Sequence, residues 1–147
     1  ACHKFKIGAQ KKNVNIEISY AINFPDVFCD KIRVQKSIES IIDNALKFTP
    51  TGGKINLSIY TDQAGNCVIS CKDNGKGMSP QEITKAFSND TQLDDIYSAP
   101  CTGIGFGISY AKKLIEKHDG SISIISAPNS GTKLNLNIPS DRLRYSE

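Results

Sequence analysis

The stretch KIRVQKSIESIIDNALKF, residues 31–48, carries apolar side chains three and four positions apart. That spacing is the period of an amphipathic α-helix. Asp30 before it is a favoured N-cap residue, and the sequence TPTGG after it contains the proline and glycine that end helices. We therefore predict a helix over these residues, with an apolar face formed by Ile32, Val34, Ile38, Ile41, Ile42, Ala45 and Leu46.

Several other segments alternate apolar and polar residues, which is the pattern of half-buried β-strands. We expect these strands at residues 14–20, 54–60, 67–72, 121–127 and 132–138. Ser79 and Pro80 begin a short helix that runs to Phe87, and another helix is expected from about residue 105 to about residue 118. The order favours an α/β two-layer sandwich (α+β), with a mixed, mostly antiparallel sheet and its helices on one face.

The 147 residues, 39% of them hydrophobic, are enough for a single domain with its own core. The net charge of +3 is not gathered into a basic stripe, so nucleic acid is not an expected partner. No run approaches the roughly 20 apolar residues of a membrane span, and no signal peptide opens the chain. We expect a cytoplasmic domain without direct membrane contact, and the abrupt start favours a fragment of a longer protein.

The cysteines contain no CxxC pair; they are Cys2, Cys29, Cys67, Cys71 and Cys101. A structural zinc would need further ligands at suitable spacing, and the two histidines do not supply them. We therefore expect reduced thiols rather than a metal site or a disulfide framework.

Polar residues on the helix at 31–48 are the first candidate functional feature. Ser37, Ser40, Asn44 and Lys47 follow one another in steps of three and four, so they share one face. A solvated surface is the usual reason for such a face. Two further segments favour a functional interpretation instead.

The first of these segments is Asp73-Asn74-Gly75-Lys76-Gly77, directly after a predicted strand. Glycines let the backbone approach a planar ligand closely, and a carboxylate accepts hydrogen bonds. Asp73 could therefore read an exocyclic amine such as that of adenine. The alternative is a glycine turn in which the Asp side chain bonds its own backbone.

The other segment is CTGIGFGISY, residues 101–110, with glycine at positions 103, 105 and 107. It leads into a predicted helix, and the free N–H groups of a helix N-terminus favour an anion such as phosphate. It lacks the P-loop pattern and follows no strand, so the repeat is weak on its own. The polar, irregular residues before it indicate a functional lid or a disordered segment.

Taken in order, these motifs resemble the catalytic ATP-binding domain of sensor histidine kinases. The same superfamily of Bergerat-fold proteins includes the gyrase, Hsp90 and MutL ATPases. SIIDNALKFTPTGG is similar to the N box, DNGKGM to the G1 box and GIGFGI to the G2 box. The closing segment KLIEKHDGSISIISAPNSGTKLNLNIP is similar to the family's last helix and hairpin. The resemblance covers about residues 15–140 and implies one catalytic domain over 1–147, with the dimerisation and acceptor-His domain absent from this chain.

The resemblance implies roles for individual residues. Asn44 would hold Mg²⁺ and Lys47 would contact phosphate, which makes these two the catalytic candidates. Phe48 would stack on adenine, Asp73 would bond the adenine amine, and Thr132 would bond nearby through a shared water. The remaining nucleotide-binding candidates come from the G1 box, the G2 box and, for Phe87, the F box that precedes the lid; they are Gly75, Gly77, Met78, Phe87, Gly103, Ile104, Gly105, Phe106 and Gly107. An ATP lid would cover about residues 88–106, anchored at its start by Phe87.

Departures from the family pattern leave alternatives open. Ser40 stands where histidine kinases commonly have Asn and the superfamily's ATPases have a Glu that activates water. Glu39 projects to a different side of the helix, so a hydrolytic ATPase lacks its expected base. Asp90 replaces the second Phe of the F box, and Ile104 stands where Thr or Ser is frequent in the G2 box. A pseudokinase that only binds nucleotide, a superfamily ATPase and a plain interaction domain therefore remain as alternatives.

The implied cofactors and partners follow from the same resemblance. They are ATP and Mg²⁺, the protein's own dimerisation domain with the acceptor His (a homodimer in the full-length protein), and the receiver domain of a response regulator. A membrane-anchored sensor with this domain on its cytoplasmic side fits equally well.

Overall fold

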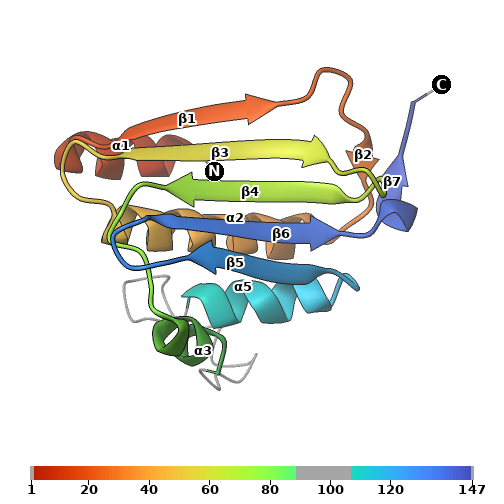
Figure 1. The fold of residues 1–147 in the computed structure, drawn as a ribbon. Coiled ribbons are helices and arrows are strands. Elements are labelled where there is room, and N and C mark those ends of the chain that lie inside the picture. Colours follow the sequence, from red (N-terminus) through yellow and green to blue (C-terminus); the bar gives the residue numbers. More distant parts are fainter. Residues whose placement is uncertain (1, 89–106, 147) are drawn as a thin grey trace.

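A five-stranded sheet forms one layer of the molecule (Figure 1). The computed structural model describes residues 2–88 and 107–146, with side chains from Phe5 onward. Across the sheet the strands lie in the order β1 (Asn15–Tyr20), β3 (Lys54–Thr61), β4 (Cys67–Asp73), β6 (Thr132–Ile138) and β5 (Ser121–Ser126). Only β1 and β3 pair in parallel; the other neighbours are antiparallel. The predicted mixed, mostly antiparallel sheet is confirmed.

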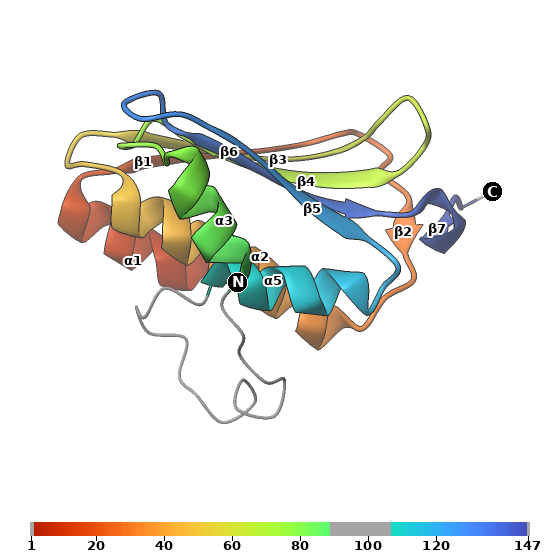
Figure 2. The same ribbon diagram turned by 60° about the horizontal axis from the view of Figure 1, so that its bottom comes forward.

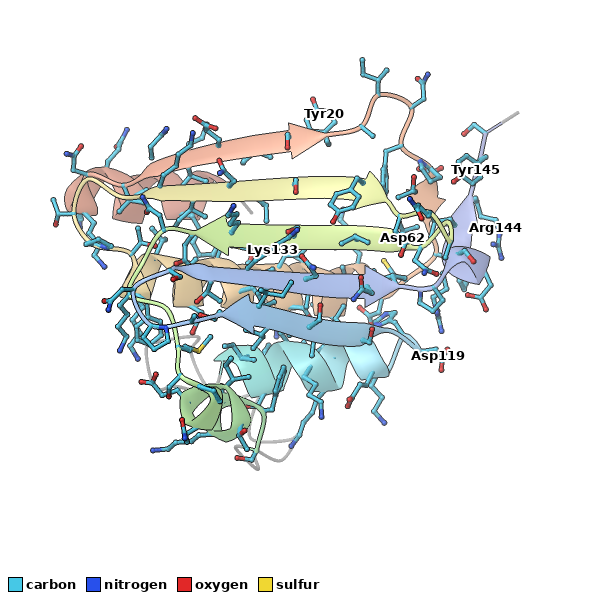
Figure 3. The ribbon with its side chains drawn as sticks, viewed as in Figure 1. Tyr20, Asp62, Asp119, Lys133, Arg144 and Tyr145 are labelled. Carbon is cyan, nitrogen blue, oxygen red and sulfur yellow. The ribbon has the colours of Figure 1, made fainter. Side chains whose placement is uncertain are left out.

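The helices of residues 2–88 and 107–146 form the second layer on one face of the sheet, and no described segment covers the other face (Figure 2). They are α1 (Cys2–Lys12), α2 (Lys31–Phe48), α3 (Pro80–Ser88) and α5 (Gly107–Glu116). Side chains on the helix-facing side of β3, β4 and β6 are almost fully buried, among them Ile55, Ile69 and Leu136. The opposite side is polar, and Figure 3 shows Lys133 on it. The two-layer sandwich predicted from the alternating patterns is therefore correct.

Helix α2 has the predicted bounds, and its ends are capped as the sequence indicates. The Asp30 carboxylate accepts a hydrogen bond from the Arg33 N–H at 3.1 Å, and the Thr49 N–H donates to the Ala45 carbonyl. The predicted apolar face has one error, because Ile32 is 66% exposed in the first turn.

Helix α3 begins with the predicted Ser79 cap. The backbone N–H of Ser79 donates to the Glu82 carboxylate at 2.8 Å, and the N–H of Glu82 donates to the Ser79 hydroxyl at 3.2 Å. This reciprocal pair is a capping box, and Pro80 in the first helical position needs no donor there.

Three elements were not predicted from the sequence. Helix α1 packs Phe5 and Ala9 into the core, although it has a weak apolar face and no acidic residue in its first turn. Strands β2 (Asp26–Val27) and β7 (Leu143–Arg144) pair with each other, beside a 3₁₀ turn at Ser140–Arg142. The hydrophobic core therefore extends outside residues 15–140, over which the sequence resembles the family, since Phe5, Ala9 and Leu143 are buried.

His118 is buried and connects the start of α2 to the end of α5. Its Nε2 accepts a hydrogen bond from the backbone N–H of Asp30 at 2.9 Å, and its Nδ1 lies 2.9 Å from the Leu114 carbonyl. Because a carbonyl only accepts, Nδ1 carries the proton and the ring is neutral. These contacts give His118 a structural role between α2 and α5.

Among the described residues, Cys29, Cys67 and Cys71 are free thiols, and no cluster of His, Cys, Asp or Glu could hold a metal. Burial raises the pKa of Cys67 to about 11 and that of Cys71 to about 12, so both stay protonated at neutral pH. None of the described helices is both long and apolar enough to span a bilayer.

Candidate functional site

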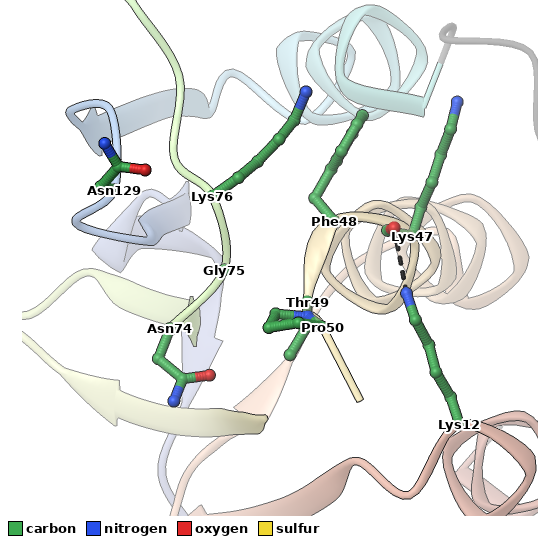
Figure 4. A pocket seen from close by; sticks show the side chains of 9 residues that line it. All are labelled: Lys12, Lys47, Phe48, Thr49, Pro50, Asn74, Gly75, Lys76 and Asn129. Atoms are coloured by element: carbon green, nitrogen blue, oxygen red, sulfur yellow. Dashed lines mark hydrogen bonds between the residues drawn. The ribbon is translucent and has the colours of Figure 1, made fainter. Parts of the chain in front are cut away.

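The candidate site lies where α2 ends and where β4 ends beside the start of β6. An open pocket of about 330 Å³ is found there (Figure 4). Its lining comes from α1, the end of α2, the glycine turn after β4 and the β5–β6 turn: Lys12, Lys47, Phe48, Thr49, Pro50, Asn74, Gly75, Lys76 and Asn129. The segments that carry the N-box and G1-box motifs therefore meet in space.

Asp73 is the most unusual charged group of the site. It is the last residue of β4 and only 6% exposed. Burial raises the pKa of its carboxyl, while hydrogen bonds from the backbone N–H groups of Gly75 and Thr132 act in the opposite direction. The Gly75 N–H donates to Asp73 Oδ1 at 2.8 Å, so the turn that was the alternative interpretation does form.

The glycines of the turn after β4 allow close backbone contacts. A Cβ at Gly75 would lie 2.5 Å from the carbonyl oxygen of Phe48, at the end of α2. Gly77 has φ +69°, and a Cβ on it would overlap the carbonyl oxygen of Ala127 in the β5–β6 turn. No side chain fits at either position, because backbone carbonyl oxygens of neighbouring segments occupy the space next to each glycine.

Two ammonium groups lie near the ring of Phe48. Nζ of Lys47 is 5.3 Å and Nζ of Lys76 is 4.8 Å from the ring centroid. Figure 4 shows the three side chains pointing the same way from the two walls of the pocket. Cations at this range gain from the ring's quadrupole, and together they make this wall positive.

Lys12 caps the C-terminal end of α2. Its Nζ donates to the carbonyls of Leu46 at 2.6 Å and Lys47 at 3.1 Å. These carbonyls belong to the last turn of the helix, where they lack helical partners and where a cation is favoured. Lys12 therefore fixes the backbone that carries Lys47 and Phe48.

Asn44 lies one turn before Phe48 and is partly exposed. Within the described part of the chain its side-chain amide has no hydrogen-bond partner, so its oxygen is available to a ligand. Ser37 and Ser40 share its face but are 0% and 6% exposed. The solvated-surface interpretation is therefore wrong for these two, since α5 covers them; a Cβ at Gly107 would lie 3.2 Å from the Ser40 carbonyl oxygen.

Thr132 pairs directly with Asp73 across β4 and β6 and with Ser126 across β6 and β5. Its hydroxyl is 2.9 Å from that of Ser126, which also accepts from the Met78 N–H at 2.8 Å. Met78 is buried in the core, and Phe87 packs against the same core from α3. The structure thus brings Asp73, Thr132 and Met78 together, whereas Phe87 supports the helix that follows.

Four predicted residues lie outside the described part of the chain, together with nearly all of the expected lid: Gly103, Ile104, Gly105 and Phe106. Gly107 is described and begins α5. Sequence reasoning missed Lys12, Lys76 and Ser126. Lys76 stands between the two glycines of the G1 motif, and Ser126 ends an alternating strand opposite Thr132, so a sequence pattern pointed to each of them. No sequence pattern pointed to Lys12.

A family model described as histidine kinase-, DNA gyrase B-, and HSP90-like ATPase matches residues 29–142. The adaptive-response sensory kinase SasA of a Synechococcus strain is 31% identical over 128 residues, 87% of this chain and 33% of that protein. The circadian input-output histidine kinase CikA of Synechocystis is 32% identical over 133 residues, 89% of this chain and 18% of that protein. The chain thus spans a third or less of the length of these relatives.

Solved structures share the fold. The mycobacterial sensor histidine kinase MprB aligns with a TM-score of 0.75 at 21% identity, over 99% of this chain and 94% of that one. Full-length ShkA, solved in complex with AMPPNP, aligns with a TM-score of 0.79 at 20% identity, over 98% of this chain and 28% of that one. The fold expected from the glycine boxes is therefore confirmed.

Proposed function

This chain belongs to the histidine kinase-, DNA gyrase B- and HSP90-like ATPase family, and we propose that it is the ATP-binding catalytic domain of a two-component histidine kinase. The observation that carries the proposal is the buried Asp73 carboxylate directly before the glycine turn whose Gly75 and Lys76 line the positively charged pocket. A carboxylate buried without a compensating cation among the described residues is costly unless a ligand uses it.

We assign adenine recognition to Asp73, Thr132 and Phe48. The Asp73 carboxylate has lone pairs beyond the one that Gly75 uses, and these accept hydrogen bonds from the exocyclic amine. Thr132 is its direct neighbour in the sheet and contributes a second polar atom. The ring of Phe48 supplies an apolar surface at the pocket wall for the base.

We assign the phosphate groups to Lys47 and, as an addition to the family pattern, to Lys76. Nζ of Lys47 and Nζ of Lys76 lie 5.3 Å and 4.8 Å from the Phe48 ring centroid, so both positive charges stand on the same side of the pocket. The start of α5 at Gly107 adds backbone N–H groups at a helix N-terminus, which favour an anion.

The available amide of Asn44 fits a Mg²⁺ site that takes one protein ligand. Its oxygen is a neutral hard donor, and Mg²⁺ in nucleotide sites takes its remaining ligands from phosphates and water. When bound, the ion neutralises charge on the phosphates. Asn44 and Lys47 are three residues apart on α2 and so share one face of the helix, which supports a joint role of the two at the triphosphate.

The acceptor in this proposal is a histidine on a separate dimerisation domain. Its imidazole nitrogen forms a bond to the γ-phosphorus while the bond from phosphorus to the bridging oxygen breaks, which leaves ADP. The protein contributes positioning and positive charge to this transfer. A homodimeric full-length protein, a response regulator whose Asp receives the phosphate, and a cytoplasmic site of action complete the proposal.

Hydrolysis by water is less well supported by the site. The Glu39 carboxylate accepts a hydrogen bond from the Gln35 amide at 3.0 Å on the outside of α2, and the position one turn before Asn44 is the buried Ser40. Neither Glu39 nor the residue at position 40 therefore supplies the carboxylate that would activate water beside Asn44. A pseudokinase and a superfamily ATPase stay as the two alternatives.

Transfer to an acceptor separates these alternatives. The chain, ATP labelled on its γ-phosphate and Mg²⁺ are incubated with the dimerisation domain of the same full-length protein and with a variant of it whose acceptor His is Gln. We expect label on the domain with the histidine alone. Release of free phosphate without the acceptor domain indicates an ATPase, and binding of ATP with neither reaction indicates a pseudokinase.

A further inference from the structure

Ser126, the last residue of β5, makes three hydrogen-bond contacts with one hydroxyl group. Its Oγ accepts from the Met78 N–H at 2.8 Å, donates to the Gly131 carbonyl at 2.8 Å, and lies 2.9 Å from the Thr132 hydroxyl. Ser126 therefore connects the end of the glycine turn after β4 to the turn between β5 and β6. Ser126 lies in the closing segment that resembles the family's last hairpin, but the resemblance assigns no role to it.

The proton of the Thr132 hydroxyl can be placed from these contacts. A hydroxyl has one proton to donate and two lone pairs. A carbonyl cannot donate, so the Ser126 proton goes to Gly131, and the contact with Thr132 is a hydrogen bond only if Thr132 donates. The reverse arrangement would leave two oxygen atoms 2.8 Å apart with no proton between them.

Thr132 lies between Asp73 and Ser126 in the sheet, so the direction of its hydroxyl proton determines what it can offer a ligand. Asp73, Thr132 and Ser126 form a row across three neighbouring strands, and Thr132 lies in the middle. Thr132 and Ser126 face the helix layer, as do Leu134 and Ile124 farther along their strands. With its proton directed to Ser126, Thr132 has only lone pairs left for a ligand beside Asp73.

We propose that Ser126 is a positioning residue that makes Thr132 an obligate hydrogen-bond acceptor, so that the base subsite selects purines with a 6-amino group over those with a 6-oxo group. This inference rests on the proposed ATP-binding function. Asp73 and Thr132 then both present acceptors, directly or through a shared water. Adenine offers donors to them, whereas the 6-oxygen of hypoxanthine or guanine is itself an acceptor.

The test compares the dissociation constants of ATP and inosine triphosphate, which have the same phosphates and differ only in the polarity of the base edge. In the wild type we expect ATP to bind more tightly. In Ser126→Ala the Thr132 hydroxyl is free to turn and donate to the 6-oxygen of inosine triphosphate. The ratio of the two dissociation constants should then fall about tenfold, which corresponds to the net contribution of one hydrogen bond. Ser126→Thr keeps a hydroxyl and retains the preference.

Two comparisons separate positioning from simple loosening of the hairpin. A structural role alone would weaken both nucleotides equally and leave their ratio unchanged, and that result would overturn the proposal. In a Thr132→Val background, Ser126→Ala should not change the ratio further. If Ser126→Ala does not fold, Ser126→Cys, whose thiol is a weak donor and acceptor, serves in its place. Absence of ATP binding by the wild type would contradict the proposed function itself.

Discussion

Asp73 and Thr132 are paired directly across β4 and β6, and the backbone N–H of Thr132 hydrogen-bonds to the Asp73 carboxylate. Burial outweighs this bond and the one from Gly75, so the pKa of Asp73 is raised. In the free domain the carboxyl therefore takes up a proton at a higher pH than an ordinary Asp does.

This shift predicts a pH dependence for ATP binding. The ionised carboxylate accepts a hydrogen bond from the adenine amine, whereas the protonated group offers it one acceptor fewer. Affinity should thus be full above the raised pKa and fall as the pH drops through it, starting above the ordinary Asp value of about 3.9. Calorimetric titration with ATP at a series of pH values measures this.

Asp73→Asn provides the control for that series. Its amide does not titrate and presents a donor to the adenine amine unless it flips, so we expect ATP affinity to fall by about tenfold or more. The remaining affinity should not change with pH in the same range. Near-normal affinity in this variant would remove Asp73 from the base site.

Gly77→Ala should destabilise the fold strongly. Gly77 has φ +69°, and an added Cβ would overlap the Ala127 carbonyl oxygen. Gly52→Ala is a matched control, because Gly52 has φ +81° but no atom within 4 Å of an added Cβ. We expect Gly52→Ala to cost about 1 kcal/mol of unfolding free energy and Gly77→Ala about 3 kcal/mol or more in urea unfolding. Equal losses would mean that the close approach at Gly77 has no energetic effect.

Lys76→Ala should weaken ATP binding about three- to tenfold at low salt. The loss should be smaller at high salt, because dissolved ions screen the attraction between the Lys76 charge and the phosphates. Lys47→Ala should behave in the same way, and adenosine, which lacks phosphates, should be nearly unaffected by either. Lys133→Ala is the control, since this lysine stands on the uncovered face of the sheet (Figure 3). A Lys76→Ala variant that binds ATP like the control would exclude Lys76 from the phosphate site.

His118→Ala should cost about 2–3 kcal/mol of unfolding free energy, because it leaves the Asp30 N–H and the Leu114 carbonyl without their partner and opens a cavity. His118→Gln restores an acceptor for the Asp30 N–H and should recover part of the loss. Denaturant unfolding of the three proteins measures the series. No difference between the Ala and Gln variants would show that the bond to Asp30 contributes nothing.

The parts of the fold predicted correctly are those with local signals. Helix α2 has an N-cap, a helical period and a proline–glycine stop, so its bounds follow from the sequence. Helix α1 was missed because its stability comes from packing Phe5 and Ala9 on the rest of the core. The two-residue strands β2 and β7 are too short to show a period, and their pairing joins residues more than a hundred positions apart.

For the site, the sequence indicated residue types and order but not contacts. The burial of Ser40 and of Asp73 depends on which elements pack around them, α5 in one case and β6 in the other. The contacts of Ser126 with Met78 and of Lys76 with Phe48 form only when the fold brings segments that are distant in the sequence together.

The most direct measurement is a calorimetric titration of the purified chain with ATP in the presence and absence of Mg²⁺, beside the Asp73→Asn and Asn44→Ala variants. We expect saturable binding by the wild type, strong loss of affinity in Asp73→Asn, and loss of the Mg²⁺ dependence in Asn44→Ala. A folded wild-type chain that binds no ATP at millimolar concentration would contradict the proposed function.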